Sequence, residues 1–163
     1  DKMMELKITG QQGEVMKESV EYAMKIAYSL LDDNEKNKIL EDSRNKNNFG
    51  LLIHTPDAGT KKEGPSAGAA MTLAIYSVLA NRKVNNTIAL TGEIDLWKNV
   101  KMIGGVGAKL NGAKNAGVKL ALIPNENLDD LNILRNDMLS PEDDEFKVEV
   151  IETIEDVIKY CII

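Results

Sequence analysis

The sequence predicts one compact α/β (α+β) domain with mixed sheets and flanking helices. Strand-like and helix-like segments alternate along its 163 residues, as they do in mixed α/β and α+β domains. Hydrophobic residues make up 43% of the chain and charged residues 28%, which is ordinary for a globular domain. A chain of this length can bury one good core, so we do not expect a second full domain.

Hydrophobic periodicity defines the elements of the first half. Residues 2–8 form a predicted strand and residues 13–31 a predicted helix with one apolar face. Residues 32–48 are mostly Asn, Lys, Asp and Glu, so we expect a mobile surface segment with at most a short helix. A strand over residues 49–54 and a loop that contains glycine lead to a helix over residues 66–80. This helix is apolar nearly all round, which predicts that it is buried.

The second half continues the alternation. Residues 87–91 form a predicted buried strand, and residues 95–102 a hairpin that turns at Lys98-Asn99. The remaining predicted elements are a helix around Lys109, a strand over 118–123, a helix within 128–136, a strand over 146–151 and a last helix from Thr153.

Charge, cysteine content and the length of apolar runs argue against several classes of binding partner. The net charge of −6 and the pI near 4.9 argue against a nucleic-acid partner, because phosphate contacts need clustered Lys and Arg. The single cysteine, Cys161, cannot form an internal disulfide, and no Cys/His cluster has metal-ligand spacing. No apolar run is long enough for a membrane span and no secretion signal is visible. We therefore expect a soluble protein of the cytoplasm or an organellar matrix, with no membrane partner.

The most informative segment is residues 63–68 (EGPSAG), which places Ser66 where a loop turns into the apolar helix. Serine is a favoured N-cap and proline is favoured near helix starts, so a plain cap is one interpretation. However, Gly64, Ala67 and Gly68 remove side-chain bulk from around the hydroxyl, and a cap does not need that clearance. Free N–H groups at a helix start also stabilise a negatively charged oxygen. Ser66 is therefore a candidate nucleophile.

A serine nucleophile needs a base, and two residues are candidates. His54 is the single histidine and could belong to a Ser-His-Asp triad. Lys109 would have only glycine, alanine and valine one turn away on its helix. A lysine in water has a pKa near ~10.4, whereas a general base works best at about 7–8, and apolar neighbours favour the neutral amine by desolvation. If Lys109 is the base, activity should rise with pH as it loses its proton.

Several motifs occur in an order that is typical of one family. They are residues 13–19 (GEVMKES), His54-Thr55-Pro56, residues 64–68 (GPSAG), residues 91–94 (TGEI), residues 103–105 (IGG) before Lys109, and residues 123–127 (IPNEN). The ordered set resembles the proteolytic domain of the Lon ATP-dependent protease family over most of the chain. The resemblance implies a Lon protease-domain fold for residues 1–163.

The resemblance also implies a serine endopeptidase with a Ser66-Lys109 dyad that cleaves unfolded or damaged proteins through an acyl-enzyme. By the same resemblance, Thr91 orients the lysine amine, although it is also an ordinary β-branched strand residue. His54 lies outside the dyad, where it lines the cleft or holds a strand end. The supporting residues are Thr91, Glu63, His54, Gly64, Pro65 and Ala67.

For the whole protein, the resemblance implies polypeptide substrates, protein quality control and a homohexameric ring. It implies no cofactor in this chain. ATP and magnesium are expected to act in a separate ATPase module, since no Gly-x4-Gly-Lys-Ser/Thr phosphate loop occurs here. We expect that module, and the first strands of the protease domain, to lie outside residues 1–163.

The sequence departs from the family pattern at two positions, and two rival functions stay open. Lys61 stands where many family members have proline, and Glu63 replaces an aspartate. A carboxylate near Lys109 would stabilise the charged amine, so we expect Glu63 to point away or to pair with a backbone donor. Residues 105–107 (GVG) partly match a dinucleotide-binding turn. The GPSAG helix start could also belong to a noncatalytic anion-binding or assembly module.

Overall fold

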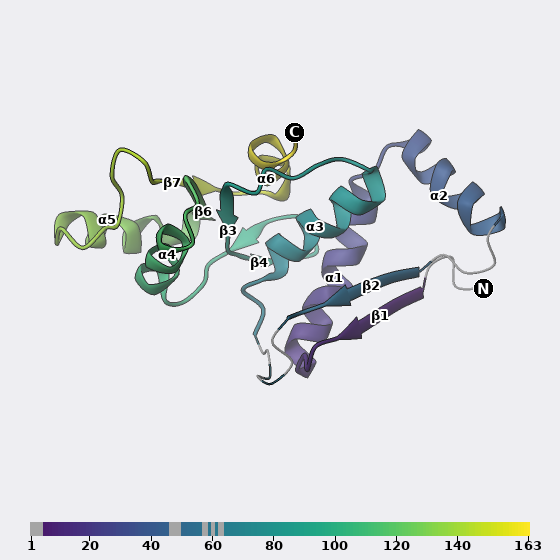
Figure 1. The fold of residues 1–163 in the computed structure, drawn as a ribbon, viewed down its shortest axis with the longest axis horizontal. Helices are drawn as coiled ribbons and strands as arrows, with labels where there is room; N and C mark the ends of the chain where they lie inside the picture. Colours follow the sequence, from purple (N-terminus) through teal and green to yellow (C-terminus); the bar gives the residue numbers. More distant parts are fainter. Residues whose placement is uncertain (1–4, 46–49, 57–58, 60, 62–63) are drawn as a thin grey trace.

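The structure is a computed structural model that describes residues 5–45, 50–56, 59, 61 and 64–163. Its elements form two groups, which lie side by side in Figure 1. The group on the right contains β1, β2, α1, α2 and α3, and the group on the left contains β3, β6, β7, α4 and α5. The mixed α/β fold with flanking helices confirms the predicted fold class.

In the first group, a two-stranded parallel sheet packs beside two helices. The sheet pairs β1 (Glu5–Thr9) with β2 (Gly50–His54) so that Thr9 lies opposite His54. The two helices, α1 (Glu14–Ser29) and α3 (Gly68–Ala80), contact each other more extensively than any other pair of elements. Their apolar residues, with Ile39 of α2 (Asp33–Asn45), form one of the cores.

The second group is built on a three-stranded parallel sheet in the order β3-β6-β7. Its strands are β3 (Ile88–Leu90), β6 (Leu120–Pro124) and β7 (Lys147–Ile151). A short antiparallel ribbon of β4 (Glu93–Ile94) and β5 (Val100–Lys101) follows β3 along the chain. The helices are α4 (Val106–Asn115), α5 (Leu128–Asn136), which follows the 3-10 turn η1 (Asn125–Asn127), and α6 (Ile154–Cys161).

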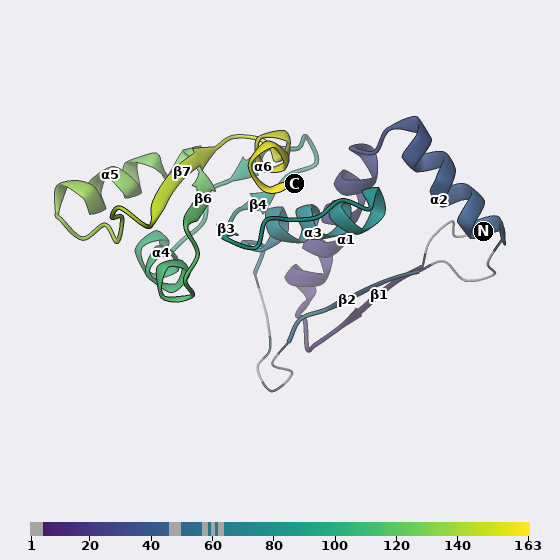
Figure 2. The same cartoon turned by 45° about the horizontal axis from the view of Figure 1, so that its top comes forward.

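The two groups share a core. Ile26 of α1 and Ala69 and Leu73 of α3 belong to the same buried cluster as Leu122 of β6 and Val157 of α6. Figure 2 shows α6 and β4 between the two groups. This shared core fixes the start of α3 relative to the β3-β6-β7 sheet.

Three predictions about individual elements are corrected. Residues 33–45 form a full helix rather than a mobile polar segment. Ile39 is buried against the first group, and Asp32 and Glu35 each donate a backbone N–H to the other's side-chain carboxylate, which caps the first turn. The predicted buried helix is open on one side, where Val78 is 65% exposed. The predicted buried strand over residues 87–91 is half-buried, because Ala89 and Leu90 line an open cleft.

Candidate active site

Ser66 lies in a turn that precedes α3. The helix begins at Gly68, its N-cap is Ala67, and no side chain caps it. The N–H of Gly68 donates to Pro65 O at 3.0 Å, which closes the turn. The interpretation of Ser66 as a plain cap is therefore wrong, and so is a helix that starts at residue 66. Within the described residues, the Ser66 hydroxyl has no hydrogen-bond partner.

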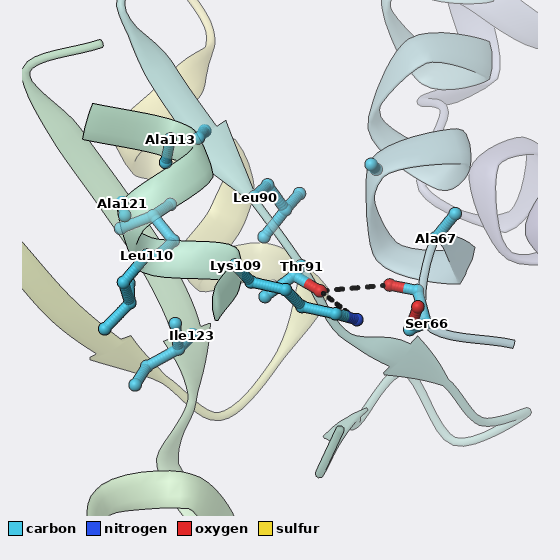
Figure 3. Close-up of a pocket in the computed structure, with 12 residues that line it drawn as sticks. Ser66, Ala67, Leu90, Thr91, Lys109, Leu110, Ala113, Ala121 and Ile123 are labelled. Atoms are coloured by element: carbon cyan, nitrogen blue, oxygen red, sulfur yellow. Dashed lines mark hydrogen bonds between the residues drawn. The ribbon is translucent and has the colours of Figure 1, made fainter. Parts of the chain in front are cut away.

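Lys109 enters the same region from the other group of elements. It lies on α4, which begins after Gly105 in the left-handed conformation at φ 70°, and its side chain is partly buried. Lys109 Nζ donates to Thr91 Oγ1 at 3.5 Å. Figure 3 shows the amine pointing across the cleft toward the Ser66 turn.

Thr91 connects the two candidate residues. Its hydroxyl donates to the backbone oxygen of Ser66 at 3.4 Å while it accepts from the Lys109 amine. Both contacts are drawn in Figure 3. No hydrogen bond joins Ser66 Oγ directly to Lys109 Nζ among the described residues. The amine and the hydroxyl thus share one cleft without a direct hydrogen bond between them among the described residues.

The cleft is small and apolar. Its volume is about 330 Å³. Ser66, Thr91 and Lys109 are its polar residues, and the others are Ala67, Ala70, Ala89, Leu90, Leu110, Ala113, Ala121, Leu122 and Ile123. Aliphatic walls lower the local dielectric constant, which strengthens the interactions of a charge that develops during a reaction. Most of these wall residues had no signal in the sequence beyond hydrophobicity, because they come from four separate elements.

Among the described residues, two of the four backbone N–H groups that follow Ser66 are unpaired. The N–H groups of Gly68 and Ala69 are occupied, since they donate to Pro65 O and Gly92 O at 3.0 Å each. In the part of the chain that the structure describes, the N–H groups of Ala67 and Ala70 have no acceptor. These two N–H groups, one before the helix and one in its first turn, are the candidate oxyanion donors.

The two glycines of the motif do not have the predicted role of clearing space around the Ser66 hydroxyl. Gly64 adopts φ 106°, a backbone conformation that residues with a side chain rarely adopt, so a glycine is needed here for the backbone conformation. Gly68 is buried, and a Cβ there would lie 3.0 Å from both Ile94 N and Ile94 Cγ2. Its smallness lets α3 approach β4, and it does not clear space for a substrate.

The remaining candidates lie around this cleft. His54 lies in a neighbouring cleft between β2 and α3, where its Nδ1 lies 2.9 Å from Thr9 Oγ1. That contact joins the ends of β1 and β2. Pro65 is half-buried in the Ser66 turn. Glu63 lies outside the described residues. Among the described residues, no group of three or more His, Cys, Asp or Glu could hold a metal ion.

One rival function is excluded by the topology. A dinucleotide-binding turn joins a strand of a parallel sheet to a helix. Here the strand before residues 105–107 is β5, which within the described part of the chain pairs with β4 in an antiparallel ribbon and with no parallel strand. The GVG segment therefore lacks the required setting.

Comparison with known proteins decides the family. The family model for the Lon protease (S16) C-terminal proteolytic domain matches residues 1–163. The chain belongs to the Lon protease family. It is 40% identical over 157 residues to the Lon protease homolog of Acanthamoeba polyphaga mimivirus, 38% over 173 to the Lon protease of Campylobacter concisus, and 44% over 128 to that of Desulfatibacillum aliphaticivorans.

These matches cover most of this chain but a small part of each relative. They span 95%, 97% and 78% of the chain, and 15%, 21% and 15% of the respective Lon proteases. The chain thus corresponds to the proteolytic domain of Lon. In addition, no helix among the described residues combines the length and hydrophobicity of a membrane span.

Proposed function

We propose that this Lon proteolytic domain is a serine endopeptidase in which Ser66 is the nucleophile and Lys109 the general base. The observation that carries the proposal is the shared cleft, in which both residues face an apolar surface and contact the same Thr91 hydroxyl. A triad built on His54 has less support, because its imidazole lies in the neighbouring cleft.

The proposed reaction has two stages. Neutral Lys109 takes the proton of Ser66 Oγ, which attacks a peptide carbonyl carbon, and the N–H groups of Ala67 and Ala70 stabilise the resulting oxyanion. Each such donor is commonly worth about 3 kcal/mol in the transition state. The lysine then gives its proton to the leaving amine, the C–N bond breaks, and water later releases the acyl group from the serine.

For the complete protein, we propose the properties that its family membership implies. Its substrates are unfolded or damaged polypeptides, and its protomers assemble in a hexameric ring. ATP and magnesium act in a separate ATPase module. The compartment is the cytoplasm or an organellar matrix, in agreement with a single unpaired cysteine.

The test is covalent modification of the full-length protein by a fluorophosphonate or a peptide boronate. We expect modification at Ser66, and loss of peptide cleavage by at least about 1,000-fold in Ser66→Ala and Lys109→Ala. Lys119→Ala, which removes an exposed lysine outside the cleft, is the matched control and should retain activity. A protein that stays unmodified at Ser66, while it binds anions there, would instead be the noncatalytic module.

A further inference from the structure

We propose that Gly92 is a positioning residue, which holds the Ser66 turn in register with Thr91 and Lys109. This inference rests on the proposed function of Ser66. It concerns the link between β3 and β4, whose backbone contacts the turn on one side and the core on the other.

The Gly92 backbone is hydrogen-bonded to the Ser66 turn and the start of α3 through both its N–H and its carbonyl oxygen. Its N–H donates to Ser66 O at 2.9 Å, and its carbonyl oxygen accepts from Ala69 N–H at 3.0 Å. Ser66 O also accepts from the Thr91 hydroxyl at 3.4 Å. The nucleophile is therefore held at its own carbonyl by two consecutive residues, and the first turn of α3 is held by one of them.

Only a glycine fits at this position. A Cβ on Gly92 would lie 2.3 Å from Val100 Cγ1, far inside the 3.0 Å below which real Cβ contacts do not occur. Ala69 Cβ and Pro124 Cγ would be at ordinary contact distances of 3.5 and 3.6 Å. Val100 is a single well-defined obstacle, and its removal should make the position tolerant of alanine.

Val100 does not move away easily. It is 3% exposed, and its N–H donates to Glu152 O at 2.8 Å. A side chain at position 92 would therefore displace the Gly92 backbone away from Val100. The hydrogen bonds to Ser66 O and Ala69 N–H would then be distorted, or the Ser66 turn would move with the Gly92 backbone.

The same displacement would also change how the Ser66 turn lies relative to the contact between Thr91 and Lys109. Thr91 is anchored to the sheet by its N–H, which donates to Leu122 O at 3.2 Å, and its hydroxyl accepts from Lys109. A displacement at position 92 changes the distance between this anchored hydroxyl and the serine. Misplacement of a reacting group by about 1 Å can cost about 100-fold in rate.

The experiment compares Gly92→Ala, Val100→Ala and the double variant in the full-length protein. The readouts are the rate of Ser66 modification by a fluorophosphonate, kcat and KM for a peptide, and the thermal midpoint. Gly112→Ala is the matched control, because a Cβ at that exposed helical position has nothing within 4 Å. We expect Gly92→Ala to lose about 100-fold in acylation rate and kcat with a nearly unchanged KM. The double variant should return to within about threefold of Val100→Ala.

Outcomes separate this inference from the function on which it rests. Folded Gly92→Ala that acylates at the wild-type rate would overturn the positioning role, as would a double variant as slow as Gly92→Ala. If Gly92→Ala does not fold, two double variants are compared instead, in which Val100→Ala is combined with either Gly92→Ser or Gly92→Ala. The larger serine should again slow acylation, and equal rates would contradict the inference. A wild-type protein that does not react at Ser66 would refute the proposed function itself.

Discussion

Thr91 is the residue through which the candidate nucleophile and base contact one another. Its hydroxyl is both a donor to Ser66 O and an acceptor for Lys109 Nζ. In the proposed mechanism, this hydroxyl orients the amine so that its nitrogen can accept the serine proton. An ordinary strand threonine would not need either contact.

We predict that Thr91→Val lowers kcat by about tenfold or more, because the isosteric side chain keeps the strand packing but loses both hydrogen bonds. KM and the thermal midpoint should change little. Steady-state peptide cleavage measures this effect, and Thr91→Ser, which keeps the hydroxyl, is the control. A fully active Thr91→Val would return Thr91 to a purely structural role.

His54 provides the test of the alternative triad. Its imidazole contacts Thr9 at the strand ends and lies in the cleft next to that of Ser66. We predict that His54→Ala retains activity within about tenfold of wild type, since the residue holds no reacting atom in the Lys109 mechanism. Peptide cleavage rates decide this, and a loss as complete as that of Ser66→Ala would favour the triad.

At the scale of elements, local sequence signals predicted most of the helices and strands. The helix over Leu128–Asn136 lies where the pattern placed it. The hairpin predicted over residues 95–102 forms with Lys98-Asn99 in its turn, but the turn spans residues 95–99 and the first strand is Glu93–Ile94. The errors have nonlocal causes. Asp33–Asn45 is helical because Ile39 reaches the core of another pair of helices. The start of α3 is displaced to Gly68 because Gly92 takes the Ala69 amide.

The last helix, α6, carries a pH-sensitive cap. Thr153 is its N-cap, and Asp156 accepts the N–H groups of Thr153 and Glu152 at 3.0 and 3.1 Å. The hydrogen bond from the Thr153 backbone is the main cause that lowers the pKa of the Asp156 carboxyl below its ordinary value. Because the folded state holds the carboxylate, its stabilisation is complete above the unfolded pKa of about 3.9 and is lost as pH falls through the lower folded pKa.

We therefore predict that Asp156→Asn lowers the urea midpoint at pH 7 and that its difference from wild type shrinks as pH falls below about 4. Urea unfolding followed by circular dichroism at several pH values measures this difference. A difference that stays constant down to pH 2 would mean that the carboxylate charge contributes nothing at this cap.

At the scale of the whole molecule, the candidate site lies where the two groups of elements meet. Ser66 comes from the group of α1 and α3, whereas Thr91 and Lys109 come from the group of the β3-β6-β7 sheet. The sequence motifs predicted a place in the site for all three residues, which the structure brings to one cleft. The shared core that sets their separation could not be predicted, because it depends on pairings between strands and helices that are far apart in the chain.

Cys161 reports on the integrity of this shared core. It is 1% exposed, belongs to the same cluster as Ala69 and Leu122, and burial raises the pKa of its thiol to about 11. Since the thiolate is the form that attacks a disulfide reagent, we predict that Cys161 of the native protein resists the reagent at pH 8 and reacts fully in denaturant. Absorbance of the released thiolate follows the reaction. Fast labelling without denaturant would show that the core opens readily.

The central claim is that Lys109 activates the Ser66 hydroxyl, and the rate of Ser66 acylation by a fluorophosphonate tests it most directly. In wild-type protein we predict rapid acylation, because Lys109 takes the proton of the attacking hydroxyl. In Lys109→Ala we predict a rate lower by at least about 1,000-fold. Equal acylation rates in the two proteins would contradict the account.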